Sequence, residues 1–190
     1  MLFNSLEFII FLVLVFLVYW KLDRIRQNLL LLAVSYIFYG WWDWRFLFLI
    51  FISSTISFFL GNKIHGTDNI RIRRIYLTIN LVSSLGILGF FKYFNFFVDS
   101  LQELFMSVGA ASISVSTLNV ILPVGISFYT FKELSYAIDV YRRKIPAANN
   151  FIEFLAFVSF FPQLVAGPID KAQNFLVQFQ QGREFKTEEA

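Results

Sequence analysis

Long uncharged apolar runs, separated by short polar stretches, are the main pattern along this chain. A transmembrane helix needs roughly 20 mostly apolar residues, or about 30 Å at a rise of 1.5 Å per residue. By this rule the pattern predicts an all-α fold, a polytopic membrane helix bundle with about six segments. These segments cover residues 3–20, 28–39, 46–60, 75–97, 120–141 and 151–169.

Two boundaries are marked by a local change in the sequence. The second and third segments are short, and Gly40 is expected to break the helix between them, beside Trp41, Trp42 and Trp44, which suit the lipid headgroup region. Beyond residue 169 the chain turns polar. We therefore expect membrane helices over residues 1–169 and a polar tail over residues 170–190.

The sixth segment contains residues that interrupt a helix. Proline removes a backbone donor, and in hydrocarbon a broken backbone persists only where it is buried in protein or lines a cavity. We therefore expect the segment to kink or re-enter rather than cross as a straight helix. The interruption is assigned to Pro162, Gln163, Gly167 and Pro168.

Composition agrees with a membrane protein and excludes several kinds of site. The chain is 57% hydrophobic and 20% aromatic, which leaves too little polar surface for a soluble globule. It has no cysteine and one histidine, His65, so disulfides, thiol chemistry and a zinc site are not expected. We interpret His65 as an exposed loop residue.

The connecting stretches alternate in charge. "KLDRIRQ", "GNKIHGTDNIRIRR" and "RRK" are basic, whereas residues 99–119 hold two acids and no base. By the positive-inside rule the basic loops face the cytoplasm, which places the N-terminus outside. Because the bases are divided among short loops, no nucleic-acid partner is expected.

The fifth segment carries ionisable residues at membrane depth. At about 100° per residue, one face of about 120° gathers Tyr129, Lys132, Glu133, Tyr136, Asp139 and Arg143, opposite Phe131, Leu134, Ile138 and Tyr141. Hydrogen bonds to tyrosines four residues away would lower the cost of burying the lysine and the glutamate. Such groups face a protein interior or a cavity, so the face either lines a chamber or forms a structural polar network.

Four blocks of sequence resemble one family. "YIFYGWWDWRFLFLI", "GFFKYFNFFVDS", "LPVGISFYTFKELSYAIDVYRRK" and "FFPQLVAGPI" occur in this order. Together they resemble the N-terminal portion of the membrane-bound O-acyltransferase (MBOAT) family. The resemblance is to its bacterial branch, which includes the alginate O-acetyltransferase membrane component and the D-alanyl transfer protein.

The resemblance implies a helix bundle in the bacterial cytoplasmic membrane. Such proteins take an acyl group, here expected to be acetyl, from cytoplasmic acyl-CoA or an acyl carrier protein, without a bound cofactor. They deliver it to hydroxyls of an exported polysaccharide or cell-wall glycan, often with a periplasmic or extracellular acyltransferase partner. Tyr129, Lys132, Glu133, Tyr136 and Asp139 would then line the central chamber.

One departure from the family concerns catalysis. The family's catalytic histidine lies in a later Trp-His-Gly block, which has no match here, and His65 does not inherit its role. We therefore assign no catalytic residue and no metal ligand. The chain is expected to be part of a longer enzyme that needs its C-terminal helices, and to be inactive alone. Two alternatives remain, a non-catalytic membrane scaffold or assembly subunit, and a transporter or channel.

Overall fold

The computed structural model describes residues 5–107, 120–165, 167 and 170–183, and all regular elements within these residues are α-helices. This confirms the predicted all-α class. The helices, in chain order, are α1 (Leu6–Tyr19), α2 (Arg24–Asp43), α3 (Arg45–His65), α4 (Ile70–Ser107), α5 (Ile126–Tyr141), α6 (Phe151–Ser159), α7 (Phe161–Val165) and α8 (Ala172–Gln180).

Two of these helices are long and apolar enough to cross a membrane. They are α3, with 21 residues, and α4, with 38. The first apolar helix, α1, is shorter, with 14 residues in the described part of the chain. The structure therefore supports two of the six predicted segments by length and composition.

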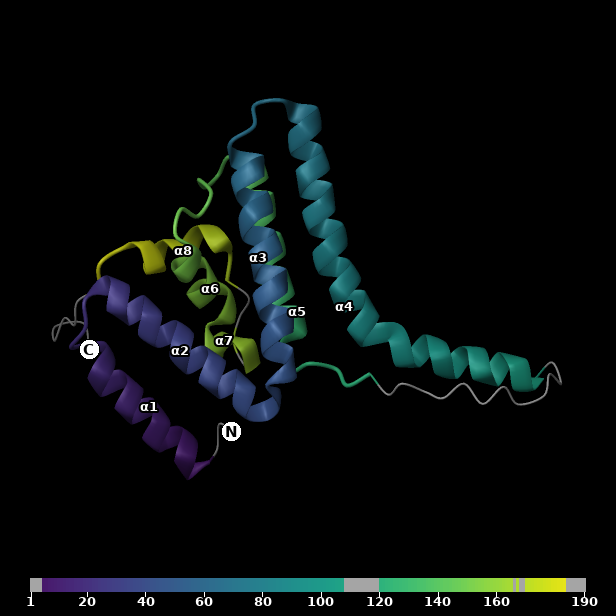
Figure 1. The fold of residues 1–190 in the computed structure, drawn as a ribbon, viewed down its shortest axis with the longest axis horizontal. Coiled ribbons are helices and arrows are strands. Elements are labelled where there is room, and N and C mark those ends of the chain that lie inside the picture. Colours follow the sequence, from purple (N-terminus) through teal and green to yellow (C-terminus); the bar gives the residue numbers. More distant parts are fainter. Residues whose placement is uncertain (1–4, 108–119, 166, 168–169, 184–190) are drawn as a thin grey trace.

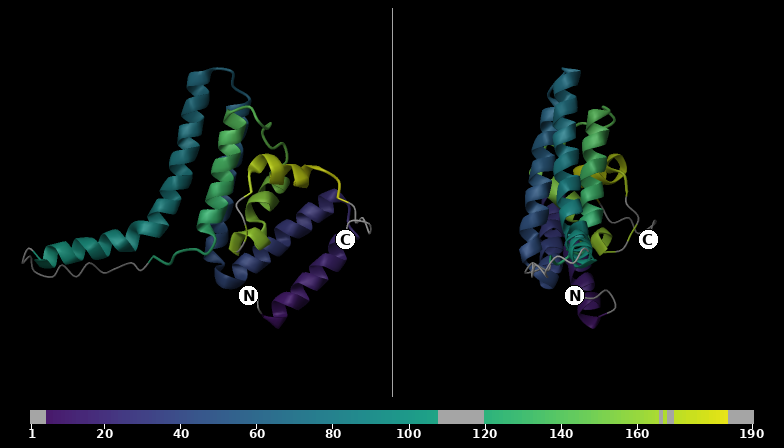
Figure 2. Two further views of the ribbon diagram at one scale, coloured as in Figure 1. Left: turned by 180° about the vertical axis from the view of Figure 1, so that it is seen from behind. Right: turned by 90° about the vertical axis from the view of Figure 1, so that its right-hand side faces the viewer.

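The helices form three groups around a shared core. Figures 1 and 2 show α3 and α5 between α4 on one side and α2, α6 and α8 on the other. Buried aromatic and aliphatic side chains from α2, α3, α5, α6 and α8 form one continuous cluster, which includes Ile50, Tyr136, Phe154 and Phe157. Helix α5 thus lies at the centre of the fold, with its sides covered by other helices.

Helix α1 lies along α2 and contacts little else. Phe8 of α1 packs with Val34 and Phe38 of α2 and with Phe161 of α7 in a second, smaller cluster. Phe8 is the only described residue of α1 that is buried, and Leu6 is 70% exposed. A helix that is apolar after Glu7 and has so much exposed surface is suited to contact with lipid or with further helices.

Helix α4 extends beyond the body of the molecule. At 1.5 Å per residue its 38 residues span about 57 Å, nearly twice the thickness of a bilayer core. Figure 1 shows that the helix bends partway along, so that its second half projects away from the other helices. Its first half packs against α3 and α5, and large apolar side chains such as Val82 and Phe96 are exposed.

A glycine and a helix break determine how α5 and the sixth segment meet. Gly125, at the N-cap of α5, has φ 77°, and an added Cβ would lie 2.7 Å from the carbonyl oxygen of Leu164. Only glycine takes this left-handed conformation freely, and only glycine allows so close an approach.

The chain between α6 and α7 breaks at Phe160, with φ −51° and ψ 106°. Pro162 then occupies the first turn of α7, where its missing N–H costs little.

Several predicted boundaries are wrong. Gly40 does not break a helix, because α2 continues through it to Asp43 and the change of direction comes at Trp44. His65 is the last residue of α3 rather than a loop residue. The acidic stretch expected to be a loop is helical up to Ser107, and its remainder, residues 108–119, lies outside the described residues. A single glycine costs a helix only about 1 kcal/mol, and the Leu, Gln, Glu and Met residues within 101–106 favour a helix.

Residues beyond the sixth segment form a helix that the sequence analysis did not predict. In α8, Ala172, Phe175, Leu176 and Phe179 are buried. They recur at helical spacing and pack on α6 and α5, which makes α8 an amphipathic helix of the core.

Candidate functional site

The ionisable face of α5 is buried in the centre of the molecule. Tyr129, Glu133 and Tyr136 have no exposed surface, Lys132 is 1% exposed, and Asp139 is 7% exposed. On the opposite face Phe131 is 43% exposed, although Leu134, expected to lie with it, is buried. The structure thus brings the five predicted chamber residues together on one buried face, and their partners show what each does.

Lys132 is bonded to the end of α6. Its Nζ donates to the carbonyl oxygens of Phe157 at 3.1 Å and Val158 at 3.5 Å. Carbonyls in the last turn of a helix have no partner within the helix and carry partial negative charge, so an ammonium there is favourable. The ring of Phe175 lies 5.2 Å from Nζ, and those of Phe157 and Phe160 lie at 5.6 and 6.0 Å. Lys132 therefore stabilises the C-terminus of α6 beside the break.

Glu133 points the other way, toward α3. Its Oε1 accepts hydrogen bonds from the hydroxyls of Ser53 at 2.9 Å and Ser54 at 3.0 Å. Its second oxygen, Oε2, is buried and has no hydrogen bond of normal geometry, although Ser57 and Ser84 also lie beside the carboxyl group. A buried oxygen without a partner is costly, so Oε2 is available to a water or to a ligand.

Tyr136 joins three parts of the fold. Its hydroxyl accepts a hydrogen bond from the backbone N–H of Ala148 at 3.0 Å. Its ring centroid lies 4.6 Å from that of Phe154 on α6, and its far edge contacts Gly61 of α3. An added Cβ at Gly61 would lie 2.5 Å from both the Tyr136 hydroxyl oxygen and a ring carbon. Glycine is required here because the tyrosine ring occupies the space of a side chain.

We expect Gly61→Ala to destabilise the folded protein by about 1–3 kcal/mol, because Tyr136 is held on three sides and cannot move away. The matched control is Gly86→Ala on α4, where no atom other than those of the adjoining helix backbone lies within 4 Å of the added Cβ. Alanine favours a helix over glycine by up to about 1 kcal/mol, so the control should be neutral or stabilising. Thermal unfolding of both variants in one detergent tests this, and equal melting temperatures would contradict the close contact.

Tyr129 and Asp139 have buried oxygens that lack partners. The Tyr129 hydroxyl has no hydrogen-bond partner among the described residues, and neither has Oδ2 of Asp139. The predicted bonds between residues four apart are wrong, since Lys132 and Glu133 instead bond to α6 and α3. The polar face therefore contains two groups. Lys132 and Tyr136 have their polar atoms bonded within the fold, whereas Tyr129, Glu133 and Asp139 each keep an unsatisfied oxygen.

Arg143 does not belong to this face. Helix α5 ends at Tyr141, and Arg143 takes a left-handed conformation with φ 57°. Its guanidinium donates to the carbonyls of His65 and Thr67 and to the carboxylate of Asp68. It thus links the end of α5 to the connection between α3 and α4.

The interrupted sixth segment packs beside α5, as the contacts between α7 and α5 show. The side chain of Gln163 donates through Nε2 to Asp170 at 2.8 Å. Just before Pro162, the backbone N–H of Phe161 donates to the hydroxyl of Ser35 on α2 at 3.2 Å. Gly167 is exposed, and Pro168 lies outside the described residues. Among the described residues the helix breaks at Phe160, two residues before Pro162, to which the interruption was assigned.

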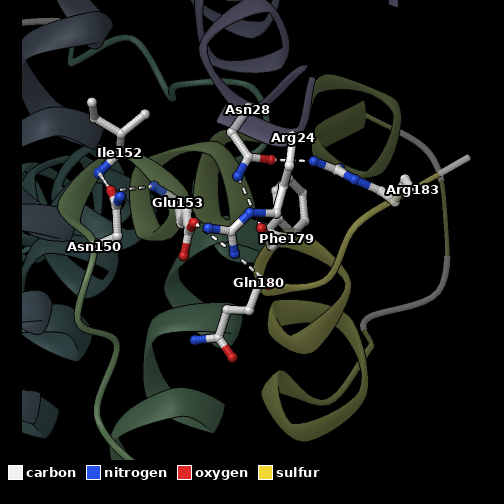
Figure 3. A network of polar contacts seen from close by, with 8 residues as sticks. All are labelled: Arg24, Asn28, Asn150, Ile152, Glu153, Phe179, Gln180 and Arg183. Carbon is white, nitrogen blue, oxygen red and sulfur yellow. Dashed lines mark hydrogen bonds and ion pairs between the residues drawn. The ribbon is translucent and has the colours of Figure 1, made fainter. Parts of the chain in front are cut away.

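A second polar network, which the sequence analysis missed, links α2, α6 and α8 (Figure 3). Arg24 forms an ion pair with Glu153 at 3.5 Å and donates to the carbonyl of Gln180. Asn28 donates to the carbonyl of Phe179 at 2.9 Å and accepts from Arg183. These residues lie up to 156 positions apart in the sequence. The sequence signal for the network is the pair of polar residues Arg24 and Asn28 at the start of a mostly apolar helix.

Among the described residues no three histidine, cysteine, aspartate or glutamate side chains gather as metal ligands. The polar face of α5 instead offers hydrogen-bond acceptors, from Glu133 and Asp139, and the hydroxyl of Tyr129. Such groups are able to orient a hydroxyl-bearing ligand or a neighbouring helix.

Comparison with known proteins gives several relatives. The chain is 42% identical over 182 residues to the protein named "Probable alginate O-acetylase AlgI" in Pseudomonas aeruginosa, an alignment that covers 94% of this chain and 34% of the relative. Its counterpart in Azotobacter vinelandii is 41% identical over 94% of this chain and 36% of the relative. The peptidoglycan O-acetyltransferase of Helicobacter pylori is 31% identical over 94% of this chain and 38% of the relative.

The chain therefore spans about a third of the length of the curated relatives it matches. No family model matches it. No solved structure matches it either. Together with the apolar helices α3 and α4, these relatives identify a membrane protein. The chain is homologous over nearly its whole length to bacterial polysaccharide O-acetyltransferases, which confirms the resemblance and is consistent with an N-terminal portion of the membrane-bound O-acyltransferase family.

Proposed function

We propose that these helices are part of a membrane O-acetyltransferase that moves an acetyl group to hydroxyls of an exported polysaccharide. The observation that carries the proposal is the similarity, over 94% of the chain, to relatives whose names specify O-acetylation of alginate or of peptidoglycan. Two different polymers appear among these relatives. The shared element is acetyl transfer to a glycan hydroxyl.

The proposed topology follows the charge pattern. Six segments would cross or enter the bacterial cytoplasmic membrane, with the N-terminus outside and the basic connections in the cytoplasm. The acetyl donor, acetyl-CoA or an acetylated carrier protein, would then approach from the basic side. The acceptor, with an external acyltransferase partner, would approach from the opposite side.

In this proposal the face of α5 borders the chamber where donor and acceptor meet. Glu133 and Asp139 are assigned to it because each keeps a buried oxygen that no described residue satisfies. Lys132 and Tyr136 would support the wall by holding α6 and the 147–148 turn in place. The interrupted segment around Pro162 packs next to α5 and would form the adjoining part of the chamber wall.

A chimera tests the proposal. The matched third of the Pseudomonas aeruginosa relative is replaced by this chain, and the chimera is expressed in alginate-producing cells that lack their own acetylase. This sequence has no Trp-His-Gly block. In the chimera the remaining two thirds of the relative contribute the rest of the family fold. We expect acetyl groups to return to the alginate, as measured by NMR of the purified polymer.

The control is the relative with its matched third deleted, which should leave the alginate without acetyl groups. The proposal would be contradicted if the chimera reached the membrane at the level of the intact relative and the polymer remained unacetylated.

A further inference from the structure

An apolar groove runs along α1, and two of its lining residues, Phe160 and Phe175, also lie beside Lys132 of α5. It has a volume of about 290 Å³ and is walled by α1, α2, the α6–α7 break and α8. At its apolar end lie Leu12, Val15 and Phe161. Pockets that bind small ligands begin at roughly 300 Å³, so this groove is large enough for one slender apolar group.

The other end of the groove is aromatic and basic. Tyr19, Trp20 and Arg183 line it. The guanidinium of Arg183 stacks between the rings of Tyr19 and Phe179, 5.5 and 5.4 Å from their centroids, and donates to Asn28. Its Nε is buried without a hydrogen-bond partner among the described residues. Figure 3 shows Arg183 reaching from the end of α8 to Asn28 on α2.

The charges beside Arg183 are those of Arg24 and Glu153, so this end of the groove has two bases and one acid. Arg24 pairs with Glu153 and Arg26 pairs with Asp23. Arg183 has no ion pair of its own among the described residues, although Glu153 acts on it at longer range. Arg183 is therefore the cation that lines the groove, and Lys21 lines a separate hollow next to Phe16 and Trp20.

We propose that this groove holds one acyl chain of an anionic phospholipid, with the phosphate beside Arg183, whose buried Nε has no hydrogen-bond partner among the described residues. From Leu12 to Tyr19 the wall is about 10 Å long, so it contacts part of the chain next to the glycerol. Tyrosine and tryptophan favour the headgroup level of a bilayer, which places the basic end of the groove where a lipid phosphate lies. The exposed apolar surface of α1 gives a lipid direct entry from the bilayer.

The head group is specified by charge and the chain by shape. A basic residue near an anionic lipid surface contributes about 1 kcal/mol. Arg183 should therefore give a preference of about five-fold for an anionic lipid over phosphatidylcholine. This inference does not rest on the proposed acetyl transfer, because no residue of the α5 face lines the groove.

Fluorescence quenching by brominated lipids tests the inference. In a variant with Trp41, Trp42 and Trp44 replaced by phenylalanine, Trp20 is the only tryptophan. The chain is placed in phosphatidylcholine nanodiscs containing increasing fractions of phosphatidylglycerol or phosphatidylcholine brominated on the acyl chain. We expect half-maximal quenching of Trp20 at a lipid fraction about five-fold lower for brominated phosphatidylglycerol.

Two variants and one control separate the contributions. Arg183→Gln should reduce the preference about five-fold, and Val15→Phe should reduce quenching by both lipids by filling the groove. Arg26→Gln, an exposed base that pairs with Asp23 and lies outside the groove, should leave both unchanged. Equal quenching by the two lipids would overturn the proposal in favour of unselective contact with bulk lipid. Absence of quenching by either lipid would overturn it as well.

Discussion

Reversing the charge at position 132, by Lys132→Glu, is expected to remove most of the folded protein from the membrane. A carboxylate there would face the carbonyl oxygens of Phe157 and Val158 and the faces of three phenylalanine rings, all of which repel negative charge. An uncompensated buried charge costs about 3–5 kcal/mol, which is comparable to the whole stability of many proteins. The measurement is the amount of monodisperse protein after detergent extraction.

Lys132→Met is the matched control for this prediction. Methionine fits the same space and its sulfur contacts aromatic rings favourably, while losing the buried charge offsets the lost bonds to α6. Its effect should be well below that of the glutamate. Normal yields of Lys132→Glu would show that this side chain does not lie against the end of α6.

Replacing Glu133 by glutamine is expected to lower acetylation about ten-fold in the chimera while the folded protein remains at its normal level. This prediction depends on the proposed function. Glutamine keeps the size of the side chain and an oxygen to accept from Ser53 and Ser54. It replaces Oε2, the oxygen without a partner, with an amide nitrogen that donates. A ten-fold loss corresponds to about 1.4 kcal/mol of transition-state stabilisation.

Ile138→Ala serves as its control on the same helix. Ile138 is partly exposed on the other face of α5, and shortening it removes packing without touching the polar groups. Acetylation by this variant should fall only in proportion to the folded protein. If Glu133→Gln behaves in the same way, the carboxyl group has a structural role alone.

The sequence was sufficient to predict the helical class and the membrane environment because long apolar runs reflect the solvent directly. It also identified the face of α5 that is buried, since ionisable residues in an apolar segment must avoid lipid. The helical period placed Lys132 and Glu133 together on that face, but the two side chains point in opposite directions, to α6 and to α3. Periodicity defines a face of a helix and leaves open which neighbour packs against it.

Other features depended on contacts between distant parts of the chain. Gly40 remains helical because its flanking residues continue the helix, whereas Gly61 is needed because a tyrosine on another helix fills its side-chain space. Helix α8 was missed because it has only nine residues, too short to be stable without packing against α5 and α6. The network of Arg24, Asn28 and Arg183 joins residues more than 150 positions apart.

The central claim is that the buried face of α5 divides into residues that hold the fold and residues that are free to act. One comparison tests it most directly, in the chimera, with acetylation and melting temperature measured for Glu133→Gln and Tyr136→Phe. Tyr136→Phe leaves the buried N–H of Ala148 without an acceptor, which costs about 1–3 kcal/mol. The account predicts a lower melting temperature with normal acetylation per folded molecule for Tyr136→Phe, and the reverse for Glu133→Gln. A parallel loss of both quantities in both variants would contradict it.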